Sequence, residues 1–171
     1  YAWVGYQTGY LKAHYPAEYM AAVLSNNMNN MDEITKFMDD IKKHDIKILS
    51  PDVNESFTQF TVNKDGNVRF GMAGVKGIGE NAVNSIIQER EDNGIYKDIF
   101  DFVERINLTA VNKKGIESLV GSGALDCFPE INRGTFAVDL GKGETFADVL
   151  LRYGNKFQKS STDATTSLFG G

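Results

Sequence analysis

Hydrophobic positions recur along most of this chain at helical spacing. Trp3, Tyr6 and Tyr10 fall on one side of a helix in residues 1–14, and residues 32–44 again place apolar side chains three or four positions apart. Further helices are predicted at residues 17–24, 80–93, 98–106, 112–120, 132–140 and 145–153. The pattern therefore predicts a mainly α-helical protein.

One short region alternates apolar and polar residues instead. Residues 60–62 and 68–70 are predicted to be two strands, and residues 63–66 (Asn-Lys-Asp-Gly) are typical of the turn between them. Residues 46–49 predict a short strand or extended piece. A turn-rich loop around Pro51 follows, so we expect two lobes joined near it.

The most specific local pattern is Met-Ala-Gly-Val-Lys-Gly-Ile-Gly at residues 72–79. It predicts a helix, a tight glycine hairpin and a second helix from Glu80. Glycine tolerates positive φ, and we expect Gly79 to require it. The unpaired N–H groups at the start of a helix bind anions, so a nucleic-acid phosphate fits there without any base being read. The prediction is a helix-hairpin-helix that grips the DNA backbone.

The residues expected to contact phosphate lie in this hairpin and in a second, weaker copy of it. The backbone N–H groups of Gly77, Gly79 and Asn81 would face the phosphate, and the side chain of Glu80 must turn away because it would repel one. The second copy is a helix capped by Asn112 and closed by a Gly-Ser-Gly run. The candidate DNA-binding residues are Lys76, Gly77, Ile78, Gly79, Asn81, Lys113 and Lys114.

Other interpretations of these residues differ in strength. A dinucleotide-binding loop is weak, because Ala82 stands at the third glycine position and no strand pattern follows. A phosphate-binding loop of the Gly-Lys-Ser/Thr type is excluded, since that sequence does not end the turn. A turn that only joins two helices, with solvated lysines beside it, remains open.

The charge balance restricts how the chain binds DNA. It has 171 residues, 42% of them hydrophobic, enough for one compact domain or two small ones. Its 18 Lys and Arg residues and 23 Asp and Glu residues give a net charge of −5. An acidic chain does not bind nucleic acid by bulk electrostatics, so any DNA contact must be local or held in place by a larger partner.

The cysteine and histidine residues predict neither a disulfide nor a metal site. The single cysteine, Cys127, excludes an internal disulfide and fits a reducing compartment. His14 and His44 have no metal-ligand spacing to it, so no metal site is predicted. No apolar run reaches membrane-spanning length and no signal-peptide pattern is present, so we expect a cytoplasmic protein without a membrane partner.

Four separate stretches resemble one family in its own order. They are residues 6–20, which open Tyr-Gln-Thr-Gly-Tyr-Leu-Lys-Ala-His-Tyr-Pro, residues 48–56 (Ile-Leu-Ser-Pro-Asp-Val-Asn-Glu-Ser), residues 70–80 (Phe-Gly-Met-Ala-Gly-Val-Lys-Gly-Ile-Gly-Glu) and residues 119–126 (Leu-Val-Gly-Ser-Gly-Ala-Leu-Asp). Together they resemble the alpha subunit of bacterial DNA polymerase III, the replicative polymerase of the C family. The resemblance covers most of residues 1–128 and is only positional after that.

The resemblance implies how the chain is divided. The implied parts are the end of the fingers domain (1–50), a linker with the β-hairpin (51–72), a tandem helix-hairpin-helix DNA-binding domain (73–128), a helical extension (129–157) and a flexible tail (158–171). The chain opens on Tyr1 inside an amphipathic segment, so we expect a fragment of a longer protein.

The resemblance also implies an activity for the longer protein, which is DNA-directed DNA synthesis, a nucleotidyl transfer, during DNA replication. Its active site lies in a palm domain whose acidic residues hold Mg²⁺. No stretch here matches that palm, so the fragment is expected to be inactive, with no catalytic residue and no cofactor of its own. The implied partners are duplex DNA, a sliding clamp and other replicase subunits.

The end of the chain resembles the family's clamp-binding peptide. Ser167, Leu168 and Phe169 match that motif, whereas Thr165 stands where a glutamine is expected, so binding should be weaker or shifted in register.

Two other functions remain open at this point. One is a stand-alone helix-hairpin-helix module of a DNA repair nuclease, and the other is a protein-interaction domain in which the hairpin is only a turn. The fingers-like stretch at residues 6–20 argues against the first, and salt-dependent DNA binding would exclude the second.

Overall fold

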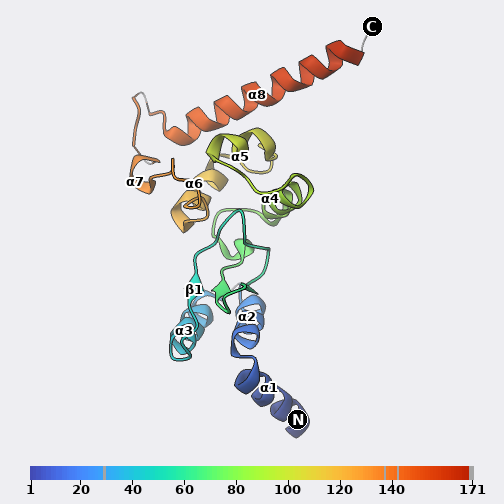
Figure 1. The fold of residues 1–171 in the computed structure, drawn as a ribbon. Coiled ribbons are helices and arrows are strands. Elements are labelled where there is room, and N and C mark those ends of the chain that lie inside the picture. Colours follow the sequence, from blue (N-terminus) through green and yellow to red (C-terminus); the bar gives the residue numbers. More distant parts are fainter. Residues whose placement is uncertain (29, 137, 142, 170–171) are drawn as a thin grey trace. The chain divides into compact units, whose positions relative to one another are not determined.

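Helices form most of the computed structural model, which confirms the mainly α-helical prediction (Figure 1). The structure describes residues 1–28, 30–136, 138–141 and 143–169. It divides into two compact units. Unit 1 consists of Tyr1–Pro51 and Glu55–Gly74, and unit 2 consists of Asp52–Asn54 and Val75–Gly171.

Unit 1 combines three helices with a small sheet. Its elements are α1 (Ala2–His14), α2 (Pro16–Asn26), α3 (Met31–Lys42), β1 (Ile48–Leu49), β2 (Thr61–Val62), β3 (Val68–Arg69) and the 3₁₀ helix η1 (Met72–Gly74). β3 lies in the centre of the sheet, parallel to β1 and antiparallel to β2. The predicted hairpin is thus confirmed, and the side chain of Asn63 accepts hydrogen bonds from the N–H groups of Asp65 and Asn67 in its turn.

The core of unit 1 lies between α2, α3 and the sheet. α2 is amphipathic and buries Met20 and Leu24, which pack in one cluster with Ile34, Phe60 and Val68. Apolar residues at every third or fourth position give α2 one apolar face. The helix is stable here because the sheet covers that face.

Unit 2 is helical and contains the glycine hairpin. Its elements are α4 (Glu80–Asn93), α5 (Ile99–Arg105), α6 (Lys113–Ser122), α7 (Arg133–Phe136) and α8 (Phe146–Phe169). Its core contains the rings of Tyr96, Phe102 and Phe128. The ring centroids of Tyr96 and Phe102 are 4.9 Å apart, and those of Phe102 and Phe128 are 6.0 Å apart. α8 lies across α5 (Figure 1).

The prediction of a helix before the glycines is wrong. Only the 3₁₀ turn η1 forms there. The N–H groups of Met72 and Ala73 donate to the carbonyls of Phe57 and Thr58 at 2.8 and 3.1 Å, so this backbone bonds to a distant segment rather than to its own preceding turn.

The ends of two other helices also differ from the sequence pattern. α7 ends at Phe136, short of the predicted residue 140. α8 continues to Phe169, where a flexible tail was expected from residue 158. The side-chain amide of Gln158 lies within 3.2 Å of three carbonyl oxygens at the end of α5, which fixes this turn of α8. Residues 170 and 171 of the expected tail lie outside the described residues.

Candidate nucleic-acid interface

The glycine hairpin turns at Gly77 rather than at Gly79. Gly77 has φ +98°, in the region that favours glycine, whereas Gly79 has φ −82° and ψ 153° as the N-cap of α4. The expectation that Gly79 requires a positive φ is therefore wrong. Lys76, Gly77, Gly79 and Asn81 are exposed, and Ile78 is half-buried.

Gly77 is also fixed by a close approach to α6. A Cβ atom placed on Gly77 would lie 2.4 Å from Oγ of Ser118 and 3.6 Å from Cε of Lys114. A side chain at this position would have to displace the Ser118 hydroxyl, so the hairpin rests against α6 at a residue without a side chain. Lys114 and Ser118 are four residues apart and therefore share a face of α6. Sequence reasoning missed Ser118, although this spacing from Lys114 was visible.

The start of α4 leaves its backbone donors open. Its N-cap is glycine, so no side chain caps it, and the first hydrogen bond of the helix runs from Val83 N–H to the Gly79 carbonyl at 3.1 Å. The N–H groups of Glu80 and Asn81 therefore precede the first helical hydrogen bond. By contrast, Asp98 caps α5 and Asn112 caps α6, as predicted for Asn112. Of these three helices, α4 offers the open anion-binding end.

The two lysines at the start of α6 have different surroundings. Nζ of Lys113 lies 2.6 Å from Oδ2 of Asp148, which also accepts hydrogen bonds from the N–H and hydroxyl groups of Thr145. The hydrogen bond from Lys113 is the main reason that the pKa of Asp148 falls to about 2, and the same bond raises the pKa of Lys113. Lys114 is exposed, and among the described residues it has no ion-pair partner; the same holds for Lys76.

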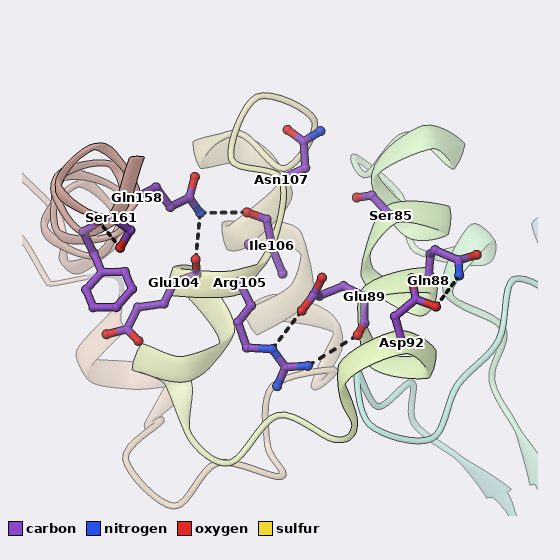
Figure 2. Close-up of a pocket in the computed structure, with 11 residues that line it drawn as sticks. Ser85, Gln88, Glu89, Asp92, Glu104, Arg105, Ile106, Asn107, Gln158 and Ser161 are labelled. Atoms are coloured by element: carbon purple, nitrogen blue, oxygen red, sulfur yellow. Dashed lines mark hydrogen bonds and ion pairs between the residues drawn. The ribbon is translucent and has the colours of Figure 1, made fainter. Parts of the chain in front are cut away.

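A groove of about 670 Å³ lies between α4, α5 and α8 (Figure 2). It contains the carboxylates of Glu89, Asp92 and Glu104. Its cation, Arg105, lies 3.0 Å from both Glu89 and Asp101. Because its carboxylates outnumber its one cation, which is already paired, the groove repels phosphate and lies outside the candidate DNA surface.

The described residues provide no metal site. They contain no group of three or more His, Cys, Asp or Glu side chains that could hold a metal ion. Within the same described residues, no helix has the length and apolar character needed to cross a membrane.

The candidate clamp-binding residues Ser167, Leu168 and Phe169 belong to the last turn of α8. Their side chains lie outside the described residues, so this prediction stays a prediction.

Comparison with known proteins supports the sequence motifs. A family model described as "Helix-hairpin-helix motif" matches residues 45–136. Proteins named DNA polymerase III subunit alpha are similar over most of the chain, which confirms the resemblance. The Vibrio cholerae protein is 43% identical over 126 residues, 74% of this chain and 11% of that protein.

Two further relatives of the same name extend the similarity to nearly all residues. The Pseudomonas aeruginosa protein is 34% identical and covers 100% of this chain, which is 15% of that protein. The Neisseria meningitidis serogroup A protein is 36% identical over 99% of this chain and 14% of its own length. The chain therefore spans 11–15% of the length of these relatives.

Proposed function

The chain belongs to the helix-hairpin-helix motif family, and from this premise we propose that it is the part of a DNA polymerase III alpha subunit that grips the backbone of duplex DNA. The relatives are similar across almost the whole chain and not only across the motif, which favours this function over a stand-alone module of a repair nuclease. DNA synthesis with Mg²⁺, contacts to other replicase subunits and a cytoplasmic location are proposed for the longer protein.

The open start of α4 carries the proposal. A phosphate approaching the hairpin would accept hydrogen bonds from exposed backbone N–H groups near Gly79 and Asn81, at the positive end of the helix dipole. Lys76, beside the turn, adds a charge, and Ile78 lies half-buried between the two glycines. None of these groups reads a base edge, so binding should be independent of sequence.

Charge sets the expected strength of this grip. The net charge of −5 gives the chain no general attraction for DNA, and Glu80 lies in the first turn of α4. Its carboxylate suits the helix dipole and opposes a phosphate. Binding should therefore be weak and should fall steeply as salt rises.

Fluorescence anisotropy with two 20-base-pair duplexes of unrelated sequence tests the proposal. We expect equal affinities for both and a linear fall of log K with log salt. Glu80→Gln should bind several-fold tighter. Glu91→Gln is the matched control, because Glu91 is exposed on the same helix and about 16 Å further along it, beyond the Debye length of about 10 Å at 0.1 M salt.

Three outcomes would contradict the proposal. They are binding that does not change with salt, a strong preference for one duplex, or an equal effect of the two glutamine variants.

We propose further that the end of α8 docks on a sliding clamp through Ser167, Leu168 and Phe169. A short peptide buries little area, so the dissociation constant should be on the order of micromolar or weaker. Calorimetry with the clamp of the same organism tests this. The double variant Leu168→Ala, Phe169→Ala should lose binding, whereas Ser160→Ala, earlier on the exposed surface of α8, should keep it. Unchanged binding by the double variant would show that this segment is not the contact.

A further inference from the structure

We infer that α6 completes the phosphate site of the glycine hairpin through Lys114. The two halves of the tandem motif then share one phosphate. Lys113 does not belong to this site. The inference rests on the proposed DNA grip. It differs from the expectation from sequence, in which both lysines served a second, separate hairpin.

The position of Lys114 is set by the contact between the hairpin and α6. Its Cε lies 3.6 Å from the place of a Cβ on Gly77, and Nζ is bonded to Cε, so the ammonium lies beside the turn. Ser118, one helical turn further on, lies directly against Gly77, with its Oγ 2.4 Å from the place of a Cβ on that glycine. The open N–H groups of α4 follow Gly77 by only a few residues. A phosphate at these donors is therefore within reach of the Lys114 charge.

The start of α6 is less suited to a phosphate site of its own. The side chain of Asn112 already accepts a hydrogen bond from Gly115 N–H at 3.1 Å. The charge of Lys113 is compensated by Asp148 at 2.6 Å, and a phosphate would have to replace that carboxylate. Neighbouring lysines in the sequence thus differ in availability because α8, 35 residues away, supplies the partner of only one of them.

Salt dependence of DNA binding separates the two lysines. In anisotropy titrations of the 171-residue chain at several salt concentrations, each phosphate contact adds about 0.9 to the slope of log K against log salt. Lys114→Gln should reduce that slope by about one contact. Lys113→Gln removes the same charge from the neighbouring position and should leave the slope unchanged.

Acid unfolding supplies the opposite readout on the same two variants. Lys113→Gln should lower the stability at pH 5 and show a smaller further loss than the parent as the pH falls to 2.5, because Asp148 then lacks the partner that keeps its folded pKa below its unfolded value. Lys114→Gln should keep the parent's stability at both pH values. This pairing also shows that both variants fold.

The outcomes distinguish this inference from the proposed function. If the parent chain shows no salt-dependent DNA binding, both fail. If it binds and the two lysine variants change the slope equally, or Lys114→Gln leaves it unchanged, the shared site is wrong while the DNA grip stands.

Discussion

At the scale of single residues, Gly77 determines the geometry of the hairpin and Gly79 does not. Alanine at Gly77 would have to adopt φ near +98° and would meet Ser118, whereas alanine at Gly79 meets no atom within 4 Å. A non-glycine residue in such a conformation costs about 1–3 kcal/mol. We therefore expect Gly77→Ala to lower the melting temperature by roughly 2–4 °C for each kcal/mol lost.

Gly79→Ala is the control for this prediction. Alanine is a poorer N-cap than glycine, which costs about 0.5–1 kcal/mol of folding free energy. Alanine also restricts the unfolded chain, which stabilises the folded state by about 0.5–1 kcal/mol, so the two effects oppose one another. Thermal unfolding followed by circular dichroism checks both variants. Equal melting temperatures for the two would show that the strain at Gly77 is unimportant.

A second residue-scale prediction concerns acid. The pKa of Asp148 is about 2 in the folded protein, mainly because of its hydrogen bond with Lys113, and about 3.9 in an unfolded chain. The folded state therefore binds this proton less tightly, so the stabilisation is complete above pH 4 and is lost as the pH falls through 2. Asp148→Asn should unfold in less urea than the parent at pH 5 and show a smaller further loss at pH 2.5. A parallel decline of both proteins would contradict the role of this ion pair.

At the scale of elements, the contact between α5 and α8 depends on Gly154. A Cβ there would lie 2.7 Å from the carbonyl oxygen of Val103 and 3.0 Å from Cδ1 of Leu108. Although alanine normally favours a helix over glycine by about 1 kcal/mol, we expect Gly154→Ala to destabilise unit 2 by about 1–3 kcal/mol through overpacking.

Gly121 provides the matched control for Gly154. It lies inside α6 with no atom within 4 Å of its Cβ position, so Gly121→Ala should stabilise by about 0.5–1 kcal/mol. Urea unfolding measures both changes. The prediction fails if Gly154→Ala is as stabilising as Gly121→Ala.

Elements with local signals could be predicted from sequence, and those fixed by distant contacts could not. The β-hairpin followed from alternation and from the Asn63–Gly66 turn, because both signals lie within ten residues. The missing helix before Gly77 depends on bonds to Phe57 and Thr58. The continuation of α8 depends on Gln158 meeting the end of α5, more than 50 residues earlier.

The same rule explains the candidate site. The motif identified the hairpin, because the glycine spacing is local. It misplaced the positive φ, because either glycine permits that conformation, whereas in the structure Gly77 adopts it where the turn lies against Ser118. The difference between Lys113 and Lys114 depends on Asp148 and could not be derived from two adjacent lysines.

At the scale of the whole molecule, the chain enters unit 2 twice. The three residues Asp52–Asn54 belong to unit 2, although the segments on both sides of them belong to unit 1. This short strap is bonded on several sides. Val53 N–H donates to the Ala124 carbonyl at 2.9 Å, and the buried side chain of Arg90 donates to the Val53 carbonyl at 2.9 Å. The helix-hairpin-helix unit therefore depends on residues that precede it by more than twenty positions.

Asn54 is the residue through which this dependence is best measured. Its side chain accepts from Tyr96 N–H at 2.8 Å and donates to the Tyr96 carbonyl at 2.9 Å, pairing both backbone groups of a buried residue. Asn54→Ala leaves both without this partner, at a cost of about 1–3 kcal/mol for each group that stays unpaired.

Amide hydrogen exchange measures this destabilisation. The amides of α4 and α6 should lose protection in Asn54→Ala, with the amides of α2 in unit 1 as the internal reference. Asn155→Ala is the control, because among the described residues the Asn155 side-chain amide bonds only to the Leu151 carbonyl of its own helix. If α4 keeps its protection in Asn54→Ala, or loses as much in Asn155→Ala, the strap does not stabilise the DNA-binding unit.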